Sequence, residues 1–396
     1  MLRVLHFSQK PPYPTIDGGC VAIKNVLENL HHLNFEVKHI TLSSEKHPFN
    51  LKNYPPEIVT DCQPETITVD LNTNALGAIS SILKSENYNL ARFYSSENSQ
   101  SLLNRIRDFQ PNFIVFDGFF STVYLNDIKE AFPETKCVLR SHNLEHTIWL
   151  KQSQNAKNPV KKRYFKLLAK QIKKEERNQV KKLSAVASIN YKEQEFYTKN
   201  GAKKVVNLPV GVKPNHTDFA IKENCYFHLG AMDWEANQIA ISHFLKDIWP
   251  KHLKSHPQDK LYLAGKSLKK YISGLSKELL KNVTCINKVE DVQSFMRNHG
   301  TMIVPVKIAA GLRIKILEGL AYGVPIIASE AACEGIKTNQ SFINKYTSKK
   351  EFLEQMNTMS SNPEFLYEMS KNAVKFAEAN FSNTEIQNQL KLLLTK

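Results

Sequence analysis

The stretch TMIVPVKIAAGLRIKILEGLAYGVPIIAS, residues 301–329, has the pattern of a strand, a turn, a helix and a second strand. Both ends are short apolar runs, and the middle repeats apolar residues at helical spacing. We expect strands at 301–306 and 324–329 with a helix over about 312–322 between them. Gly323 is expected to end the helix in the left-handed conformation, because the proline two residues later prevents its continuation. The stretch therefore predicts one βαβ unit of a parallel sheet.

The same alternation of strand and helix patterns runs along the chain in two blocks. The break between them falls near residues 212–223, which predicts an α/β protein with two doubly wound, Rossmann-like domains facing a central cleft. We expect one domain over 1–212, a second over 213–375, and a last helix over 376–396 that crosses back to the first. The expected strands are 3–8, 36–42, 112–118, 136–143, 185–190, 205–212, 225–232, 260–265, 283–289, 301–306 and 324–329.

Composition limits the classes of partner and compartment. The 396 residues carry a formal net charge of +15, which predicts an anionic partner such as nucleic acid, a phosphorylated metabolite or a membrane face. The six cysteines form no C-x-x-C pair, so neither a zinc site nor a disulfide framework is expected. We expect no signal peptide and no membrane span, and therefore a cytoplasmic protein that is soluble or peripheral on the membrane.

The turn and helix of the opening stretch have the features of an anion-binding site. The helix N-terminus should follow a strand's carboxyl end, where free N–H groups and the helix dipole favour an anion. Gly311 and Leu312 allow the backbone to approach a ligand, and Arg313 and Lys315 add two cations where the dipole disfavours them. Glu318, one turn further, could accept hydrogen bonds from two sugar hydroxyls. The alternative is an amphipathic helix whose charged side faces solvent.

The chain resembles glycosyltransferase family 4, a group of nucleotide-sugar transferases with the GT-B fold. Segments similar to the family's motifs follow one another in order along nearly the whole chain. They are PPYPTIDGG (11–19), RSHNLEH (140–146), LPVGV (208–212), FHLGAMDWEANQIAISHFLKDIWP (227–250), ILEGLAYGVPII (316–327) and NFSNTEIQNQL (380–390). The resemblance implies a retaining sugar transfer without bound metal or other cofactor. It also implies an acceptor-side N-terminal domain, a donor-binding C-terminal domain, and Glu318 as the ribose-binding residue.

The sequence departs from the family pattern at three places. Ala310 replaces the first of the usual two glutamates, which normally touches the donor sugar. The segment Ala231–Asn237 supplies neither of the Arg and Lys that usually follow the first strand of the second domain, and Val210 replaces the hinge asparagine. Arg313 and Lys315 could provide the missing positive charge, since a diphosphate in a partly desolvated site requires cations.

The segment after the strand at 136–143 carries the predicted catalytic residues. His142 and Glu145 could position a sugar hydroxyl or serve acid–base chemistry. In the alternative interpretation, Asn143 and Glu145 only cap the next helix and His142 is structural. Asp117, Arg140 and Asn143 are expected to line the cleft.

Two further loops are predicted to contact the donor. Gly18 and Gly19 precede a helix and could offer N–H groups to a phosphate, although a tight turn explains them nearly as well. Asp233, Trp234 and Asn237 follow the first strand of the second domain, where Trp234 could wall the sugar pocket or simply pack.

Residues 161–182 predict a basic amphipathic helix. The segment has ten Lys and Arg against two Glu, and Phe165, Leu168 and Ile172 recur at helical spacing. Such a helix can lie on anionic lipid through its apolar stripe, or it can be a long surface helix with a solvated face.

These observations favour a glycosyltransferase that moves a sugar from a nucleotide-sugar to a glycan or lipid-linked acceptor, in bacterial surface polysaccharide or glycoconjugate synthesis. A GT-B epimerase would use the same donor site without an acceptor. A nucleic-acid-binding protein is the alternative that charge alone suggests, but the sequence has no motif for it, and no nucleic-acid partner is expected.

Overall fold

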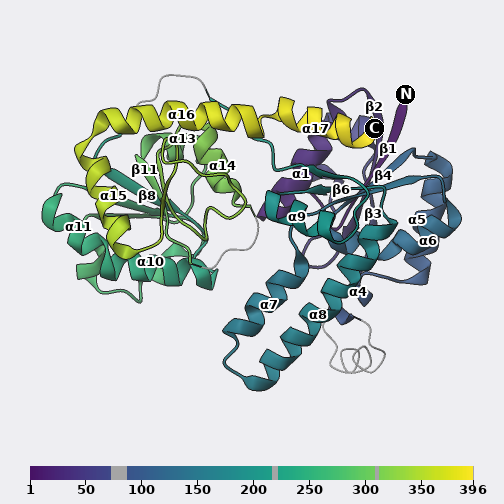
Figure 1. The fold of residues 1–396 in the computed structure, drawn as a ribbon, viewed down its shortest axis with the longest axis horizontal. Helices are drawn as coiled ribbons and strands as arrows, with labels where there is room; N and C mark the ends of the chain where they lie inside the picture. Colours follow the sequence, from purple (N-terminus) through teal and green to yellow (C-terminus); the bar gives the residue numbers. More distant parts are fainter. Residues whose placement is uncertain (73–86, 216–221, 308–311, 396) are drawn as a thin grey trace. The chain divides into compact units, whose positions relative to one another are not determined.

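The computed structural model describes four stretches of the chain, namely residues 1–72, 87–215, 222–307 and 312–395. The chain divides into two compact units, the first comprising Met1–Val210 and Ile386–Lys396 and the second Gly211–Glu385 (Figure 1). The first unit is thus built from both ends of the chain. The sequence-based boundaries at 212 and 376 differ from these transitions, because the helix that ends at Phe381 still packs in the second unit.

A parallel sheet of seven strands forms the centre of the first unit. Its strands are β1 (Leu2–Ser8), β2 (Phe35–Ser43), β3 (Glu65–Thr68), β4 (Phe113–Asp117), β5 (Lys136–Arg140), β6 (Ala185–Ser188) and β7 (Val205–Asn207). Their order in the sheet is β3–β2–β1–β4–β5–β6–β7. The order turns outward in both directions from β1 and β4, which is the doubly wound arrangement that the sequence predicts.

Helices cover both faces of this sheet, so its strands are apolar on both sides. On β4, Phe113 and Val115 enter one core, while Ile114 and Phe116 enter the other. The helices are α1 (Gly18–His31), α2 (Pro56–Cys62), α4 (Tyr88–Ala91), α5 (Ser96–Phe109), α6 (Leu125–Ala131), α7 (Glu145–Asn155), α8 (Pro159–Lys182), α9 (Tyr191–Lys199) and α17 (Asn383–Thr395), with the 3-10 helices η1 (Leu51–Asn53) and η2 (Phe119–Tyr124).

The last helix, α17, is part of the first unit's core although it is distant in sequence. Ile386, Leu390 and Leu394 are completely buried in the same apolar cluster as residues of α1 and α2. At the edge of this contact Gln387 Nε2 donates a hydrogen bond to Asn29 Oδ1 at 3.2 Å. The apolar stripe that the sequence shows in this helix therefore packs on the α1 side of the sheet.

Helices α7 and α8 form a hairpin in which they lie side by side (Figure 1). The rings of Trp149 and Phe165 pack across it with centroids 5.7 Å apart. Leu168 and Ile172 of α8 are buried, and Ile172 belongs to the core under the sheet. The prediction that the stripe of Phe165, Leu168 and Ile172 faces lipid is therefore wrong, because these side chains hold the helix on its own unit.

The second unit contains a parallel sheet of six strands. They are β8 (Cys225–Leu229), β9 (Lys260–Ala264), β10 (Val283–Ile286), β11 (Thr301–Val304), β12 (Ile326–Ser329) and β13 (Asn344–Tyr346), in the order β10–β9–β8–β11–β12–β13. The helices are α10 (Glu235–Asp247), α11 (Trp249–Ser255), α12 (Leu268–Ile272), α13 (Val292–Asn298), α14 (Ile314–Ala321), α15 (Lys349–Ser361) and α16 (Pro363–Phe381), with η3 (Lys277–Leu280).

Each predicted strand has a counterpart in these sheets, but two strands were not predicted. They are β3 and β13, which lie at the edges of their sheets and have only four and three residues. Short edge strands carry little periodic signal, because only part of each side faces a core.

Candidate functional site

The opening βαβ stretch places a helix start at the carboxyl edge of the second sheet. After β11 the chain enters α14 at Ile314, with Arg313 as its N-cap residue at φ −90° and ψ 99°. The helix is shorter than predicted at both ends, and Gly323 adopts the predicted left-handed conformation at φ 67°. Ala310 and Gly311 lie outside the described residues. The edge where α14 begins is where doubly wound sheets bind ligands.

Arg313 is a half-buried cation with two guanidinium nitrogens that have no hydrogen-bond partner in the described part of the chain. Its Nε and Nη2 atoms are buried and donate to no acceptor among the described residues. The guanidinium carbon lies 5.3 Å from the centroid of the Trp234 ring, which is a cation–π distance. Burial lowers the pKa of Arg313, and Glu334 acts in the opposite direction. A buried donor left without a partner is costly, so this group is suited to receive an anion.

Lys315 and Glu318 follow Arg313 on α14. Lys315 is exposed, and its Nζ donates a hydrogen bond to the carbonyl oxygen of Leu229 at 3.2 Å. Partial desolvation lowers the pKa of Lys315, while Glu318 raises it. Glu318 is half-buried, and burial raises its pKa against the opposing effect of Lys315. The two cations and one carboxylate are therefore grouped within the first turn and a half of the helix.

The loop after β8 packs closely around two glycines. A Cβ atom at Gly230 would lie 2.6 Å from His228 Nε2 and 2.8 Å from Asn237 Nδ2. Gly265 has φ 140°, and a Cβ there would lie 2.1 Å from the Gly230 carbonyl oxygen. Asn237 Nδ2 donates to the Ala231 carbonyl oxygen at 2.9 Å. Asn237, a predicted donor contact, is thus buried beneath the loop and supports its backbone.

His228 is a buried residue of this edge that the sequence analysis did not identify. Its Nδ1 bonds the Ile303 carbonyl oxygen at 2.9 Å, while its Nε2 has no partner in the described part of the chain. Burial lowers the pKa of His228 to about 4, and Lys315 and Arg313 act in the same direction. The ring is therefore neutral at pH 7 and adds no charge to the site.

Lys266 is a second residue that sequence reasoning missed. It lies two residues after β9, its ammonium is 3.4 Å from Asp233 Oδ2, and both side chains are exposed. Its carbonyl oxygen accepts the Met232 N–H at 2.8 Å, which ties the loops after β8 and β9 together. The signal that could have identified Lys266 was its position just after an apolar strand and a glycine, in LYLAGK.

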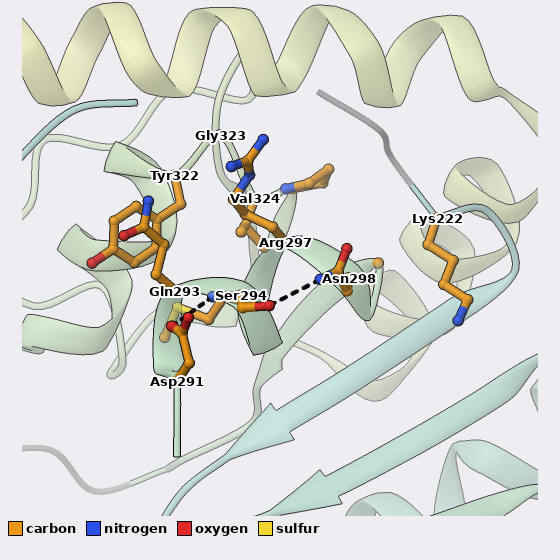
Figure 2. Close-up of a pocket in the computed structure, with 12 residues that line it drawn as sticks. Lys222, Asp291, Gln293, Ser294, Arg297, Asn298, Tyr322, Gly323 and Val324 are labelled. Carbon is orange, nitrogen blue, oxygen red and sulfur yellow. Dashed lines mark hydrogen bonds between the residues drawn. The ribbon is translucent and has the colours of Figure 1, made fainter. Parts of the chain in front are cut away.

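The second unit also has a pocket of about 390 Å³, which lies at the other edge of the sheet (Figure 2). Its lining includes Gly300 and Pro325, which precede β11 and β12, together with Asp291, Ser294 and Tyr322. Asp291 accepts a hydrogen bond from the Ser294 N–H and so caps α13. The pocket does not include Arg313, Lys315 or Glu318, so it is separate from the helix start described above.

In the first unit, strand register assembles a buried charged cluster at the carboxyl edge. Asp117 pairs with Ser8 on one side and with Arg140 on the other. Asp117 Oδ1 accepts from His142 Nε2 at 2.6 Å and Oδ2 accepts from His6 Nε2 at 2.9 Å. Burial alone raises the pKa of Asp117, but Arg140 and the hydrogen bonds from the two histidines outweigh it, so this pKa is well below its usual range.

The hydrogen bonds of Asp117 extend through His6 to a second histidine. His6 and His39 are in register on β1 and β2, and their Nδ1 atoms are 3.0 Å apart. His39 Nε2 has no partner in the described residues, and burial holds the pKa of His39 well below its usual value. Asp117 is therefore ionised at pH 7, while His39 is neutral.

Arg140 is completely buried beside this carboxylate. Its Nη1 lies 3.6 Å from Asp117 Oδ1, but none of its three guanidinium nitrogens has a hydrogen-bond partner in the described residues. Burial lowers the pKa of Arg140, while Asp117 and Glu193 raise it. Ser141 Oγ donates to Glu193 Oε2 at 2.9 Å, and burial raises the pKa of Glu193 to about 7. Sequence reasoning missed Glu193, because it lies on α9 far from the cluster in sequence.

Glu145 begins α7 and is buried, but it does not pair with His142. Burial raises the pKa of Glu145 to about 8, and Glu176 and Glu193 act in the same direction. The carboxylate partner of His142 is instead Asp117. Asn143 is half-buried, and its backbone carbonyl oxygen accepts from Ser141 Oγ at 3.1 Å.

At the start of α1, side chains of the same unit lie against Gly19, whereas Gly18 is exposed. Gly18 and Gly19 are the first residues of the helix, and Asp17 caps it by accepting the Cys20 N–H at 2.9 Å. Lys10 Nζ lies 2.7 Å from both Asp17 carboxylate oxygens, and a Cβ at Gly19 would come within 2.7 Å of the same ammonium. Gly19 therefore gives room to Lys10.

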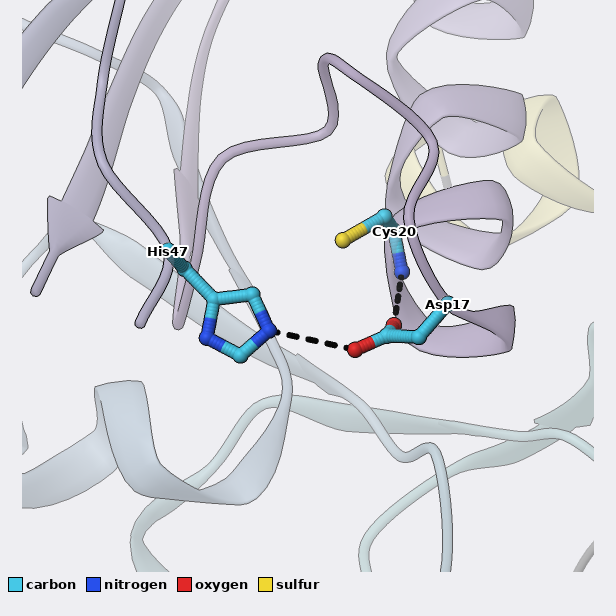
Figure 3. Close-up of side chains that lie close together, drawn as sticks. All are labelled: Asp17, Cys20 and His47. Carbon is cyan, nitrogen blue, oxygen red and sulfur yellow. Dashed lines mark hydrogen bonds and ion pairs between the residues drawn. The ribbon is translucent and has the colours of Figure 1, made fainter. Parts of the chain in front are cut away.

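Asp17, Cys20 and His47 place three metal-type ligand atoms within 4.8 Å of one another (Figure 3). His47 Nε2 lies 3.1 Å from Asp17 Oδ2. Burial raises the pKa of the Cys20 thiol, and Asp17 also raises it, whereas a metal ligand must be a thiolate. Since Lys10 already balances the Asp17 charge, the arrangement fits a capped helix better than a metal site.

A pocket of about 560 Å³ lies next to this cap at the ends of β1, β2 and β3. Phe93 and Phe120 stack with ring centroids 4.8 Å apart and form part of its lining. Lys10, His47 and Asp70 add polar and charged groups. An aromatic surface beside charged groups is suited to a polar ligand with apolar faces.

Comparisons with known proteins agree with this architecture. Residues 223–362 match the family model described as Glycosyl transferases group 1, while no curated protein sequence matches the chain. The structure of HepE from Anabaena in complex with UDP is similar over 100% of both chains, with a TM-score of 0.68 and 12% identity. Sucrose-phosphate synthase from Thermosynechococcus elongatus has a TM-score of 0.69 over 99% of this chain and 98% of its own, at 13% identity.

The lipopolysaccharide outer core galactosyltransferase WaaB, in its apo form, is similar over 98% of both chains, with a TM-score of 0.64 and 13% identity. The chain thus has the GT-B fold, as the sequence predicts, and its second unit carries the sequence pattern of the group 1 glycosyltransferases. Glycosyl transfer is the class of reaction that these matches support.

Proposed function

We propose that this chain transfers a sugar from a nucleoside-diphosphate sugar to a glycan or lipid-linked acceptor, with retention at the anomeric carbon and without a metal ion. The observation that carries the proposal is that two buried guanidinium nitrogens of Arg313, at the start of α14, have no hydrogen-bond partner among the described residues. A cation in this position opposes the helix dipole unless an anion joins it. A diphosphate would satisfy the guanidinium, Lys315 and the free helix N–H groups together.

The same groups would assist the departure of the nucleotide. Negative charge grows on the diphosphate as the bond to the sugar breaks, and Arg313 and Lys315 would stabilise it. Glu318 would accept hydrogen bonds from the ribose hydroxyls, for which it must be ionised. Lys315, which acts against the raised pKa of Glu318, favours that ionised form. Lys266 and Asp233 would border the site where the phosphates bind. The Trp234 ring would hold the Arg313 guanidinium in place.

We assign the acceptor side to the first unit, with His142 as its reactive side chain. The hydrogen bond to Asp117 fixes the Nε2–H tautomer and leaves Nδ1 as an acceptor for a sugar hydroxyl. Burial lowers the pKa of His142, and Asp117 opposes this shift. Asp117 would therefore orient the ring in the way that a carboxylate orients a catalytic histidine. We propose a role in the cytoplasmic assembly of a bacterial surface polysaccharide or glycoconjugate.

Nucleotide binding and product analysis test this function. Isothermal titration with UDP, GDP, ADP and CDP should reveal one preferred diphosphate, and Arg313→Ala should weaken its binding. Incubation with the matching nucleotide-sugars in the presence of EDTA should give transfer or slow hydrolysis. Release of an isomerised sugar without any acceptor would instead indicate an epimerase. If no nucleoside diphosphate binds at millimolar concentration, the proposal is wrong.

A further inference from the structure

One face of α8 is exposed along its length and differs sharply from the buried face. Val160, Arg163, Leu167, Lys170 and Lys174 are separated alternately by three and four residues, so they form one row along the helix. All five are exposed. We call this row the outer face of α8.

The buried side of α8 fixes the direction of the outer face. Leu168, Ile172, Glu176 and Val180 of the same helix are buried. Residues at this spacing lie on the opposite side of the helix from Arg163 and Lys170. Because α8 packs its apolar stripe against its own unit, the basic outer face points to solvent.

The residues between Glu145 and Glu175, which include the outer face, contain no acidic residue. Residues 146–174 hold nine Lys and Arg and no Asp or Glu, although the whole chain has 38 acidic residues. No ion pair involves Arg163, Lys170 or Lys174 within the residues that the structure describes. A concentration of unpaired positive charge on one surface indicates an anionic partner.

Exposed aliphatic side chains accompany these cations. Val160 is 76% exposed and Leu167 is 39% exposed, while Leu150 on the neighbouring helix α7 is 40% exposed. Proteins that bind single-stranded nucleic acids offer exposed aromatic rings to the bases. Here the rings of Trp149 and Phe165 pack on each other instead. Aliphatic groups between cations match the interface of an anionic bilayer.

We propose that the outer face of α8 docks the first unit on an anionic lipid bilayer. Val160 and Leu167 enter the headgroup region, and Arg163, Lys170 and Lys174 contact lipid phosphates. No helix in the described residues has the length and apolar character of a membrane span, so the contact is peripheral. Docking itself is independent of catalysis, whereas the lipid-linked acceptor that it would bring near rests on the proposed function.

Co-sedimentation of the full chain with vesicles tests the docking. The protein should pellet with vesicles that contain phosphatidylglycerol and stay in solution with pure phosphatidylcholine. Binding should weaken as salt rises from about 0.05 M to 0.3 M, because the Debye length shortens. Each cation at such a surface contributes enough that the triple change Arg163→Glu, Lys170→Glu and Lys174→Glu should reduce binding on the order of a hundredfold.

A matched control separates the outer face from net charge. Lys251→Glu, Lys254→Glu and Lys277→Glu make the same charge change at exposed positions of the second unit and should leave vesicle binding nearly unchanged. Val160→Ser with Leu167→Ser should weaken binding even at low salt, since apolar contact is not screened. Equal pelleting of the two triple variants would show the proposal to be wrong.

Two further readouts identify other partners and separate this proposal from the function. If the wild-type chain ignores phosphatidylglycerol vesicles but binds DNA or RNA in a shift assay, the face serves a nucleic acid and docking is refuted. Binding of the preferred nucleoside diphosphate should be the same in both triple variants. A wild-type chain that binds a nucleoside diphosphate but no anionic vesicle refutes the docking alone, and one that binds anionic vesicles but no nucleoside diphosphate refutes the proposed function alone.

Discussion

The carboxyl edges of the two sheets both carry charged side chains, but the two edges differ in how far these charges are paired with groups of the protein. In the first unit the carboxylate of Asp117 accepts hydrogen bonds from His142 and His6 and forms an ion pair with Arg140, and all four side chains are buried. In the second unit Arg313 has no ion pair among the described residues. The first edge is therefore organised before any ligand arrives, and part of its charge stabilises the fold. At the second edge two guanidinium nitrogens of Arg313 have no partner in the described residues, and a bound anion could supply one.

The largest expected effect comes from breaking the first edge. Asp117→Asn removes the carboxylate from a buried arginine and two histidines, which should lower the free energy of unfolding by about 3–5 kcal/mol. Asp233→Asn, at an exposed pair in the second unit, should cost at most about 1 kcal/mol. Urea unfolding at pH 7 measures both. Similar losses in the two variants would contradict the contrast between a buried and an open edge.

The pH dependence of stability distinguishes the two edges through their glutamates. The unfolded chain loses the Glu145 proton near pH 4, whereas the folded chain keeps it to about pH 8, so rising pH favours unfolding. Relative to wild type, Glu145→Gln should therefore gain stability by up to about 1.4 kcal/mol per pH unit between pH 5 and 7.5.

Glu318→Gln provides the control, because Glu318 is only half-buried and its raised pKa is opposed by Lys315. Its gain with pH should be smaller than that of Glu145→Gln. Urea unfolding of both variants and the wild type at several pH values provides the comparison, and parallel curves for wild type and Glu145→Gln would disprove it.

Ligand binding should respond mainly at the second edge. Arg313→Ala should weaken binding of the preferred nucleoside diphosphate by about 1.5–3 kcal/mol, because a charge-assisted hydrogen bond is lost. Folding stability should not fall, since the guanidinium has buried nitrogens without partners. Arg313→Lys keeps the charge without the bidentate geometry, so its nucleotide affinity should lie between those of the wild type and Arg313→Ala. Isothermal titration and urea unfolding of both variants test this, and unchanged affinity in Arg313→Ala would remove the phosphate role.

The smallest effect is expected at Lys266. Its ammonium is exposed and its pair with Asp233 is at the surface, so Lys266→Ala should leave unfolding unchanged. If Lys266 borders the phosphates, nucleotide affinity should fall by at most about 1 kcal/mol. A loss as large as that of Arg313→Ala would place the diphosphate nearer to β9 than we propose.

The sequence predicts the fold best where an apolar run is long and is bounded by turn-forming or helix-ending residues. The run in β4 and the Gly323 that ends α14 are examples, because their patterns depend on local backbone chemistry. Edge strand β13 escaped prediction because three residues carry no period. The prediction that the apolar stripe of α8 faces lipid was wrong, since periodicity identifies an apolar face without showing what covers it.

Candidate residues follow the same division. Arg313, Lys315 and Glu318 lie within one helical turn and a half, so spacing alone groups them. The chain from His39 through His6 and Asp117 depends on strand register, which sets distances between segments far apart in sequence. Glu193 depends on the packing of α9. No single-sequence pattern contains such information, so Asp117, Arg140 and His142 were predicted as site residues without the contacts among them, and His6 and His39 were not predicted.

The position of α17 has a consequence for how the chain is made. The second unit is one continuous segment, so it can fold as soon as residue 385 has left the ribosome. The first unit is synthesised earlier but lacks one wall of its core until Ile386, Leu390 and Leu394 appear. The unit made first is thus finished last. During synthesis its α1 side presents uncovered apolar surface to the chaperones that attend nascent chains, and premature termination before Ile386 leaves that surface permanently open to degradation.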